Sequence, residues 1–472
     1  MKKRSKHTDV SVPQTVTDFI KVHNGQETIQ FGFTDQRISA HAGLSAFASF
    51  LHRHRFGALL KNSLPARTSP NATAPEDLAL GFMTAILAGA KKLAQVAHWR
   101  RDPLLPGLLG IKRVGSQSTF SRFFAGFTSA HLNTQCFEPL WRWCLQRLAS
   151  RREGYTLDLD STQLLHPAGY QKEGVRMGHT VQGFRRCYHP LLAMVAEAKL
   201  VIGFWLRPGN SRCDNNVVAF TQELLERLPR WVRIGLVRTD SGFCYEPWLQ
   251  LLEQRGLPYI VVGRIYKPVH SLIKKTTRWQ STEIPGVEVA DEMYEGWKWS
   301  GPRRVVLIRQ RQSRRPEAAG KLLVDCPGYV YQILVTSLRA EVGALEVWRR
   351  YNPRSGSENI IKELDAAFAL PQISLKKFYA TEAALGLAVV SYNLCVLFQR
   401  HLGWLERVTA STLRFLVFST GGIISRTAGY TTIRLSVRQG RYRDWWRRVL
   451  EKLSCPFHNC VAVERLQPNW SG

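Results

Sequence analysis

The chain has 472 residues, of which 44% are hydrophobic and 11% aromatic, so it can bury a sizeable core and wholesale disorder is excluded. At roughly 150 residues per domain, this length predicts about three domains. With 65 Lys and Arg against 36 Asp and Glu, the formal net charge is +29, which predicts a polyanionic partner and favours nucleic acid over an anionic membrane surface.

The cysteines and the apolar segments favour a cytoplasmic protein without a membrane span. The nine cysteines are odd in number and form no Cys-x-x-Cys pair, which argues against a disulfide framework. Cys455, His458 and Cys460 lie close together but lack a fourth nearby ligand, so zinc is a weak alternative there. No apolar segment follows the basic start, and the longest apolar run, residues 383–398, predicts a buried core helix.

Residues 1–150 have a mostly helical pattern. Ser116 or Ser118 can cap a short helix that exposes Arg122 on its polar side. The apolar side of this helix carries Phe120, Phe123 and Phe124. The helix is either the second helix of a helix-turn-helix unit that binds DNA or an ordinary amphipathic helix with solvated arginines.

From residue 151 the pattern changes to strands that alternate with helices. Residues 191–206 are apolar and β-branched, and we expect residues 179–186 to pair with them as a hairpin. Further strands are predicted over 155–160, 234–240 and 258–264, with helices over 215–228 and 245–254 between them. This order predicts a mixed α/β sheet.

A different composition interrupts this pattern after residue 264. Glycines, prolines, tryptophans and two strand-like runs indicate a β-rich insertion, after which the chain is again helical and finally basic and aromatic. We expect residues 1–150 to form a helical DNA-binding region and residues 401–472 a basic helical end. Between them, residues 151–264 and 339–400 are the two parts of the core, and residues 265–338 are the insertion that separates these parts.

Acidic residues end two of the predicted strands. Asp158 and Asp160 alternate on one strand and point to the same face, while Asp240 ends the next strand at a glycine turn. Two carboxylates at neighbouring strand ends call for a divalent cation. The alternative is that each aspartate caps a local turn or pairs with an arginine such as Arg238.

A third acidic residue, Glu358, lies near the start of a predicted helix, on the border of its apolar stripe. If this stripe packs on the sheet, Glu358 can face the open end where the aspartates lie. Arg354 and Lys362, one turn on either side, are placed to hold phosphate or to balance charge. The alternative is a first-turn glutamate that the helix dipole favours.

These residues resemble a known family. The motif Tyr351-x2-Arg354-x3-Glu358 resembles the signature around the catalytic glutamate in one large branch of bacterial insertion-sequence DDE transposases. Residues 160–162, which begin at Asp160, resemble the first-aspartate segment of the same group. Residues 238–243, which contain Asp240, resemble its second-aspartate segment. Residues 116–122, 188–192 and 207–210 also resemble family segments, so the resemblance spans residues 110–370.

The resemblance implies an RNase H-like core that holds two Mg²⁺ ions, with Mn²⁺ expected to substitute. Asp160, Asp240 and Glu358 are then the catalytic and metal-binding residues, and Asp160 is preferred to Asp158 because Ser-Thr follows it as in the family. The branch usually carries a lysine where this chain has Asp365, so Lys362 becomes the nearest lysine for a DNA contact.

The implied activity is cut-and-paste transposition of an insertion sequence. Its partners are the inverted-repeat ends and the target, both double-stranded DNA, which a homodimer on paired ends would bind in the bacterial nucleoid. Tyr351, Arg354, Lys362 and Arg122 are the expected DNA contacts.

Related transposases stack a flipped base on an aromatic residue of the insertion, so Trp297 or Trp299 is a candidate for this role. Alternatively, both tryptophans cover the sheet of the insertion. Arginines of the insertion, from Arg303 to Arg315, are expected to contact phosphates.

Three other functions remain open at this point. One is a different RNase H-like DNA nuclease, and another is a non-catalytic DNA-binding protein derived from a transposase. The third, a zinc hydrolase, is disfavoured because His179 and His189 lack ligand spacing and are better explained as hydrogen-bonded structural histidines.

Overall fold

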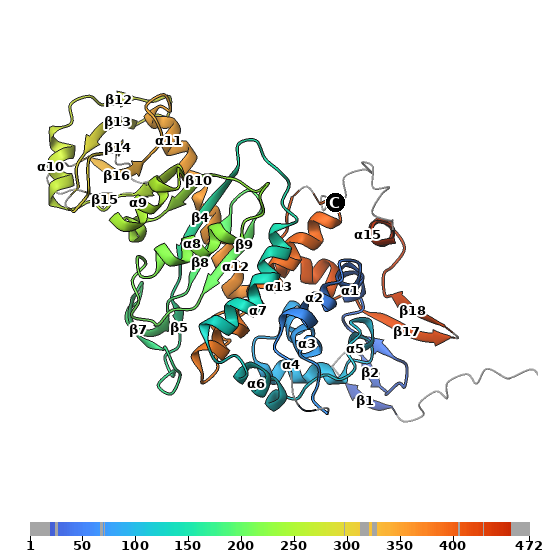
Figure 1. The fold of residues 1–472 in the computed structure, drawn as a ribbon. Helices are drawn as coiled ribbons and strands as arrows, with labels where there is room; N and C mark the ends of the chain where they lie inside the picture. The colour runs from blue at the N-terminus through green and yellow to red at the C-terminus, as the bar shows by residue number, and fades with distance from the viewer. Residues whose placement is uncertain are drawn as a thin grey trace, which may run out of the picture.

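A ten-stranded mixed sheet organises the protein in the computed structural model (Figure 1). The strand order is β12-β13-β14-β16-β11-β10-β4-β8-β9, and β15 pairs with β16 beside this path. The structure describes residues 19–23, 27–66, 69, 71–296, 298–311, 321–322, 328–404, 406–427 and 429–454.

Five strands of this sheet form the core. β8 pairs antiparallel with both β4 and β9, whereas β10 and β11 run parallel to β4. Three antiparallel strands followed by two parallel ones, with helices α8 and α9 as the crossovers, is the RNase H-like arrangement expected from the sequence. The bounds are β4 Tyr155–Ser161, β8 Leu191–Val195, β9 Leu200–Trp205, α8 Val217–Arg227, β10 Ile234–Thr239, α9 Glu246–Gln254 and β11 Tyr259–Val262.

The predicted hairpin between residues 179–186 and 191–206 is wrong. Residues 191–206 form a hairpin of their own, β8 and β9. Residues 179–186 belong instead to a separate three-stranded sheet of β5, β7 and β6, with bounds Leu164–Leu165, Gly183–Tyr188 and Arg176–Thr180. The alternation of apolar and polar residues marks a strand but does not select its partner.

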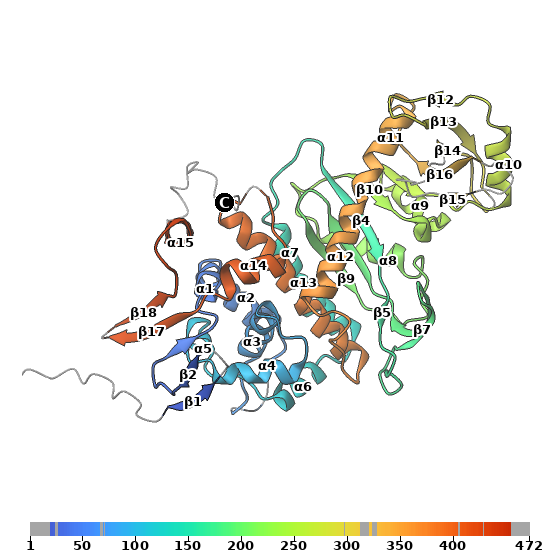
Figure 2. The ribbon, with the colours of Figure 1, turned by 180° about the vertical axis from the view of Figure 1, so that it is seen from behind.

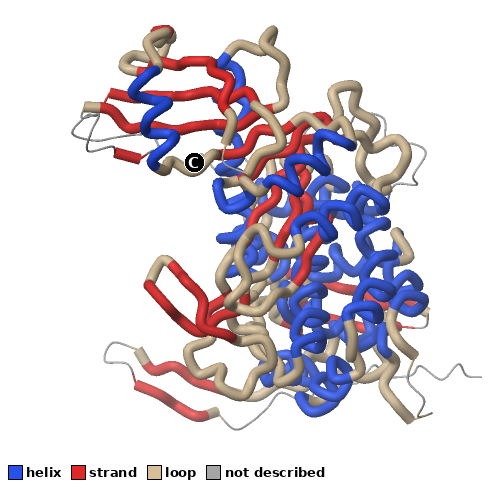
Figure 3. The backbone as a smooth tube through the Cα atoms, turned by 60° about the vertical axis from the view of Figure 1, so that its left-hand side comes forward, coloured by secondary structure: helices blue, strands red, loops and turns tan. Residues whose placement is uncertain are grey.

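The strands of the insertion do not form an independent domain sheet but extend the core sheet (Figure 3). β16 pairs antiparallel with β11, and β14 and β13 follow outward from it. The insertion projects from the helical part of the molecule, with α10 and α11 beside its strands (Figure 1). The bounds are α10 Lys267–Lys275, β12 Gln280–Ser281, β13 Val287–Tyr294, β14 Arg303–Arg311, β15 Lys321–Leu322, β16 Tyr329–Thr336 and α11 Ala344–Tyr351.

Helices cover both faces of the core sheet. Helix α8 covers one face, where Gly203 of β9 lies against Phe220 and Leu224. Leu159 of β4 is on this same face, because the strand register pairs it with Ala193 of β8 and pairs Ala193 with Gly203. The opposite face carries Asp160, which contacts α12 (Ser355–Ala367), reached from α11 through the 3₁₀ turn η3 (Asn352–Arg354). α12 therefore lies across the sheet from α8, as Figures 1 and 2 show.

Helix α13 (Phe378–His401) is the apolar run expected to be a core helix, and the structure confirms this. It is long and apolar enough to cross a membrane, but 94% of its most apolar window is buried inside the protein. Asn393 of this helix bonds both backbone groups of Val201, at 2.9 Å to the amide and 2.6 Å to the carbonyl. The amide side chain thereby satisfies the free edge of β9, the last strand of the sheet.

Regions from the two ends of the chain pack side by side (Figure 2). Arg414 donates hydrogen bonds to the carbonyl groups of Leu87 and Ala367, and Arg407 forms a two-bonded ion pair with Glu363 of α12. The N-terminal elements are β1 Ile20–His23, β2 Thr28–Phe31, β3 Ile38–Ser39, α1 Leu44–Arg53, α2 Phe56–Ser63, α3 Pro75–Leu87, α4 Leu93–His98, η1 Trp99–Arg101, α5 Leu105–Leu108, α6 Gln117–Ala125 and α7 Ala130–Leu145. The later elements are α14 Ala410–Leu413, the π-helical turn η4 Arg414–Phe418, β17 Gly422–Thr427, β18 Tyr430–Leu435 and α15 Arg441–Ser454.

A carboxyl group inside this packing predicts a pH-dependent stability. Burial raises the pKa of Glu382 from its ordinary 4.5 to about 7, although Asn133 and the amide of Leu206 donate hydrogen bonds to it. Between these pH values the folded chain keeps a proton that the unfolded chain has lost. The contribution of Glu382 to the free energy of unfolding therefore falls as pH rises from 4.5 to about 7 and is constant above that.

Urea unfolding at a series of pH values checks this. Glu382→Gln should gain stability relative to the wild type as pH rises through that window, because the glutamine has no proton to lose. Parallel stability curves for the two proteins would contradict the assignment.

Candidate active site

Two aspartates lie at neighbouring strand ends on one edge of the core sheet. The parallel register of β4 and β10 pairs Asp158 with Arg238, so Asp160 and Asp240, two residues further along each strand, occupy adjacent positions. Asp240 begins the 3₁₀ turn η2 (Ser241–Phe243), and its Oδ1 accepts a hydrogen bond of 2.8 Å from the amide of Gly242. The glycine turn thus orients the carboxylate at the open end of the strand.

Asp160 is buried and held from two elements. Its Oδ1 accepts a bond of 2.8 Å from the amide of Ser161, and its Oδ2 lies 3.2 Å from the hydroxyl of Ser357 and 3.0 Å from Nη2 of Arg354. Burial raises the pKa of Asp160 to about 6; the guanidinium of Arg354 opposes this shift and the negative charge of Asp240 adds to it. The two carboxylates are therefore close enough to repel each other.

Asp158, the rival of Asp160, is already fully engaged. Both of its oxygens accept hydrogen bonds from Arg238, at 2.7 and 2.8 Å, and both side chains are almost completely buried. Nη1 of Arg238 donates a hydrogen bond to the carbonyl of Arg350, near the end of α11. The pairing alternative thus describes Asp158, which holds the guanidinium of Arg238, and Arg238 in turn connects the sheet to α11.

A cleft of about 890 Å³ opens beside this edge. It lies between the core strands and the insertion, and its lining includes Asp240, Tyr351, Arg354 and Glu358. The side chain of Glu358 is 57% exposed, and its Oε1 lies 4.0 Å from Nη1 of Arg354. The structure therefore brings the Tyr-x2-Arg-x3-Glu residues to the aspartates.

Lys362 and Asp365 lie further along α12 and do not reach this cleft. Lys362 is exposed, and Asp365, which stands where the related branch has a lysine, is partly buried, so that burial raises its pKa to about 6. Neither lines the cleft. A DNA contact by Lys362 would have to be made outside the cleft.

The donor set of the cleft fits a divalent cation in part. Carboxylate oxygens are the ligands that Mg²⁺ and Mn²⁺ prefer. A cation would offset both the burial that raises the pKa of Asp160 and the repulsion by Asp240 that adds to this shift. Within the part of the chain that the structure describes, no three His, Cys, Asp or Glu side chains converge on one metal position. Asp160 and Asp240 are in place, whereas Glu358 would have to turn inward from solvent.

A second cavity, of about 680 Å³, adjoins the first. The two share Gly263, Arg264 and Ile333, so they are continuous along the edge of β11. Its lining combines charged and aromatic side chains, and Trp299 packs edge-to-face on Tyr294 with ring centroids 5.7 Å apart. Further aromatic lining comes from Tyr245 and Tyr266. Trp297 lies outside the described residues.

The prediction that the arginines of the insertion contact phosphates is wrong for three of them. Each is held by carboxylates of the protein itself: Arg303 by Glu246 and Glu253, Arg304 by Asp291, and Arg309 by Glu288. Periodic spacing on strands did not reveal these partners, because they come from neighbouring elements. Arg314 and Arg315 lie outside the described residues, as do Cys455, His458 and Cys460 of the possible zinc site.

Sequence reasoning missed Arg264. It follows β11, the third parallel core strand, and its Nε donates a bond of 2.9 Å to the carbonyl of Ser241 beside Asp240. The rule that carboxyl ends of parallel strands meet at one edge, applied to the aspartates, would also have identified this arginine. Ser357, which contacts Asp160, was missed as well; its place one residue before Glu358 was the available signal.

The two histidines considered for zinc lie in different settings. His189 is buried and bonded at both nitrogens, by the carbonyl of Ser211 at 2.6 Å and the hydroxyl of Ser161 at 3.0 Å. His179 is exposed on β6, where its ring contacts Phe184. The structural role predicted for His189 is confirmed.

Helix α6 is capped as predicted, and its three phenylalanines are buried. Ser116 accepts a bond of 3.2 Å from the amide of Thr119, and Arg122 is exposed. A compact helix-turn-helix unit is not formed, because the preceding helix α5 has four residues and residues 109–116 separate it from α6. The amphipathic-helix alternative describes this segment.

Comparisons with known proteins place these features in a family. No curated protein matches the chain. Among solved structures it is similar to a piggyBac transposase in a cryo-EM synaptic complex with hairpin DNA, at 12% sequence identity, 82% coverage of each chain and a TM-score of 0.42. The family model described as transposase DDE domain group 1 matches residues 22–455. Since this match covers nearly the whole chain, the protein belongs to the transposase DDE domain group 1 family and is a DNA transposase.

Proposed function

We propose that the protein moves an insertion sequence by cut-and-paste, using metal-dependent phosphodiester hydrolysis followed by strand transfer. The observation that supports this best is the placement of Asp160 and Asp240 at adjacent strand ends, beside a cleft that also contains Arg354 and Glu358. A fold assembles two like charges in this way at a stability cost, which a bound cation would offset.

In this proposal, Asp160, Asp240 and Glu358 hold the metal ions. Two divalent ions, Mg²⁺ or Mn²⁺, would supply charge stabilisation to the attacking and leaving oxygens of an in-line displacement. Asp160 and Asp240 provide the fixed ligands because hydrogen bonds from Ser161 and Gly242 orient them. Glu358 is the mobile ligand, since most of its side chain is exposed.

Two displacements make up the reaction. In the first, a water oxygen forms a bond to phosphorus and the bond to the 3′-oxygen breaks, which leaves a 3′-OH at the element end. In the second, that 3′-OH attacks a phosphodiester of the target and releases another 3′-OH. The proton of each attacking group passes to solvent, and neither displacement needs a covalent bond between protein and DNA.

Arg354 is placed to exchange one anion for another. In the structure its guanidinium pairs with Asp160 through Nη2, whereas its buried Nε has no hydrogen-bond acceptor among the described residues. A buried donor without an acceptor is costly, and a DNA phosphate in the cleft would supply one. Tyr351 lines the same cleft, so we assign both residues to the DNA strand beside the cut, with Lys362 contacting DNA from the exposed side of α12.

A cleavage assay tests the proposal. Purified protein is incubated with a supercoiled plasmid that carries the gene and its native flanking DNA, with and without Mg²⁺. We expect cuts at discrete positions on both sides of the gene that depend on the metal. Random cuts would favour another RNase H-like nuclease, and tight, salt-sensitive binding without cuts would favour a DNA-binding protein derived from a transposase.

Trp299 is the proposed stacking partner for a base displaced beside the cut. It lines the aromatic cavity next to the cleft, and stacking on an aromatic side chain contributes about 1–3 kcal/mol per base. Trp299→Ala should therefore slow cleavage by roughly 5- to 150-fold. Trp299→Phe should retain most of the rate.

The matched control is Trp231→Ala, which removes an exposed tryptophan that bonds the carbonyl of Leu148 outside this cavity. Fluorescence of 2-aminopurine at the cut position reports unstacking directly. Equal fluorescence and equal rates for Trp299→Ala and wild type would assign Trp299 to packing of the insertion.

We also propose the assembly and the division of the chain. A homodimer on paired ends would bring two clefts to the two inverted repeats, in the bacterial nucleoid. Residues 1–150 and 401–472 would bind DNA outside the cleft, residues 151–264 and 339–400 would form the catalytic core, and residues 265–338 would position the displaced base.

A further inference from the structure

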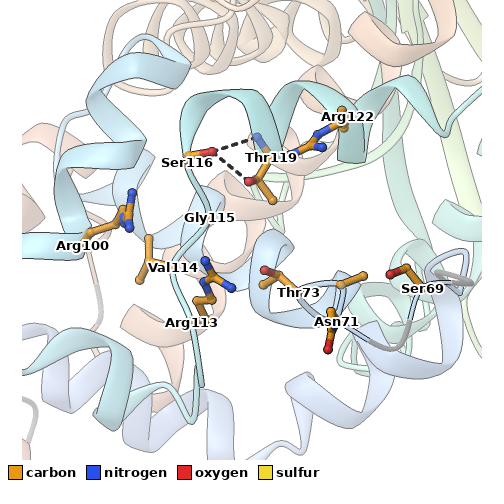
Figure 4. A pocket seen from close by; sticks show the side chains of 11 residues that line it. Ser69, Asn71, Thr73, Arg100, Arg113, Val114, Gly115, Ser116, Thr119 and Arg122 are labelled. Atoms are coloured by element: carbon orange, nitrogen blue, oxygen red, sulfur yellow. Dashed lines mark hydrogen bonds between the residues drawn. The ribbon is translucent and has the colours of Figure 1, made fainter.

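A cavity of about 300 Å³ lies in the N-terminal region, away from the residues of the catalytic cleft. It is bounded by the chain before α3, by η1, and by the loop that leads into α6 (Figure 4). The polar side chains that line it include Thr73, Arg100, Arg113, Ser116, Thr119 and Arg122.

The charge of this cavity has one sign. Arg100, Arg113 and Arg122 line it, and among the residues that the structure describes no carboxylate does. None of the three arginines forms an ion pair within that part of the chain, and all three are exposed. The Nε of Arg122 donates to the carbonyl of Ser118, which leaves its terminal groups and the other two guanidinium groups for a ligand. Three guanidinium groups around one hollow repel each other unless an anion lies between them.

The loop that carries Arg113 is fixed by packing. A Cβ atom at Gly115 would lie 2.7 Å from Cδ2 of Leu78 on α3, so the loop backbone approaches that helix as closely as glycine allows. Ser116 is held in turn by Thr119, whose amide and hydroxyl both contact its Oγ. The cavity is therefore preorganised, and Figure 4 shows Ser116 and Thr119 above Thr73 and Arg113.

The size and lining of the cavity select the ligand. Among the described residues that line it, the apolar side chains are Ala72 and Val114, and none is an aromatic side chain on which a base could stack. Hydroxyl and guanidinium donors suit phosphate oxygens, which accept from both. We propose that this cavity binds a backbone phosphate of the DNA, which fixes the position of the duplex at a distance from the cut. This inference rests on the proposed function, because it takes the bound DNA to be the end of the insertion sequence.

The test is the salt dependence of DNA binding. The probes are short duplexes taken from the DNA that flanks the gene on each side, and dissociation constants are measured by fluorescence anisotropy over a range of salt concentrations. Each phosphate contact contributes about 0.9 to the slope of log K against log salt. Arg113→Ala and Arg100→Ala together should lower the slope by about 0.9 and weaken binding at low salt.

Two variants control for charge and for folding. Arg142→Ala removes an exposed arginine of α7 that pairs with Glu138, outside the cavity, and should leave the slope unchanged. Arg113→Lys keeps the charge and should retain the slope of the wild type. Thermal unfolding should be the same for all variants, because the arginines of the cavity are exposed.

The outcomes separate this inference from the proposed function. If the double variant keeps the wild-type slope while the wild type cuts the plasmid, the cavity does not hold a phosphate and the function stands. If the slope falls but the wild type never cuts, the phosphate site stands and the cut-and-paste proposal fails. A slope that falls equally in Arg142→Ala would overturn the inference, because net charge alone would explain it.

Discussion

Asp240→Asn is expected to abolish Mg²⁺-dependent DNA cleavage and to leave DNA binding nearly intact. The substitution removes a charged ligand from the pair at the strand ends, and loss of a group at the reacting centre costs on the order of 10³-fold or more in rate. The fold should survive, because the Oδ1 of asparagine can still accept the bond from the amide of Gly242.

The measurement is the plasmid cleavage assay together with an anisotropy titration on the same DNA. Glu358→Gln should give the same loss, since it removes the third charged ligand from an exposed side chain that has no other role in packing. Glu341→Gln, in the chain before α11 and outside the cleft, serves as the matched control. Cleavage by Asp240→Asn at the rate of the wild type would remove Asp240 from the site.

Asp158→Ala is expected to act on stability instead of chemistry, with a loss of about 3–5 kcal/mol in the free energy of unfolding. The reason is that the substitution would leave the guanidinium of Arg238 buried and without a carboxylate. We expect this effect on stability even though Asp158 lies only two residues from Asp160 in the sequence. Asp160→Asn should be less destabilising, because burial and Asp240 already oppose the charge of Asp160, and because its partner Arg354 also faces the carboxylate of Glu358.

Urea unfolding of the two variants checks this contrast. The double variant Asp158→Leu with Arg238→Met should recover part of the loss, because an apolar pair replaces the ion pair. Equal destabilisation by Asp158→Ala and Asp160→Asn would show that both aspartates serve the fold and would leave the first metal ligand unidentified.

The sequence predicted most of the core and much of the cleft. Strands at Tyr155–Ser161, Ile234–Thr239 and Tyr259–Val262 follow from short runs of apolar or β-branched residues that end at glycine or at a charge. The adjacency of Asp160 and Asp240 follows from the parallel order of these strands, and the burial of α13 from its apolar composition. These features depend on local pattern and on one general rule of sheet topology.

Contacts between distant segments were not predictable in the same way. Residues 179–186 lie within the hairpin of β6 and β7, and only the observed pairing shows that this hairpin belongs to a separate sheet. The role of Arg303 depends on Glu246 and Glu253, which lie far earlier in the chain, so the sequence indicated phosphate contacts for this arginine instead. The pairing of Arg238 with Asp158 was one of the two alternatives that the sequence left open. Arg100 joins Arg113 in a cavity through tertiary packing that no spacing in the sequence records.

The continuity of the sheet through β16 and β11 has a consequence for the accuracy of cutting. Backbone hydrogen bonds join Val335 to Val261 and β11 to β10, so the aromatic cavity and the aspartates belong to one stiff surface. Neighbouring strands stand about 4.8 Å apart, and this spacing changes little under load. In the proposed function, the position of the displaced base and the position of the cut would therefore lie at a fixed separation, and we expect only a DNA end that matches this separation to occupy both. An end with a different spacing would have to distort before it could be cut.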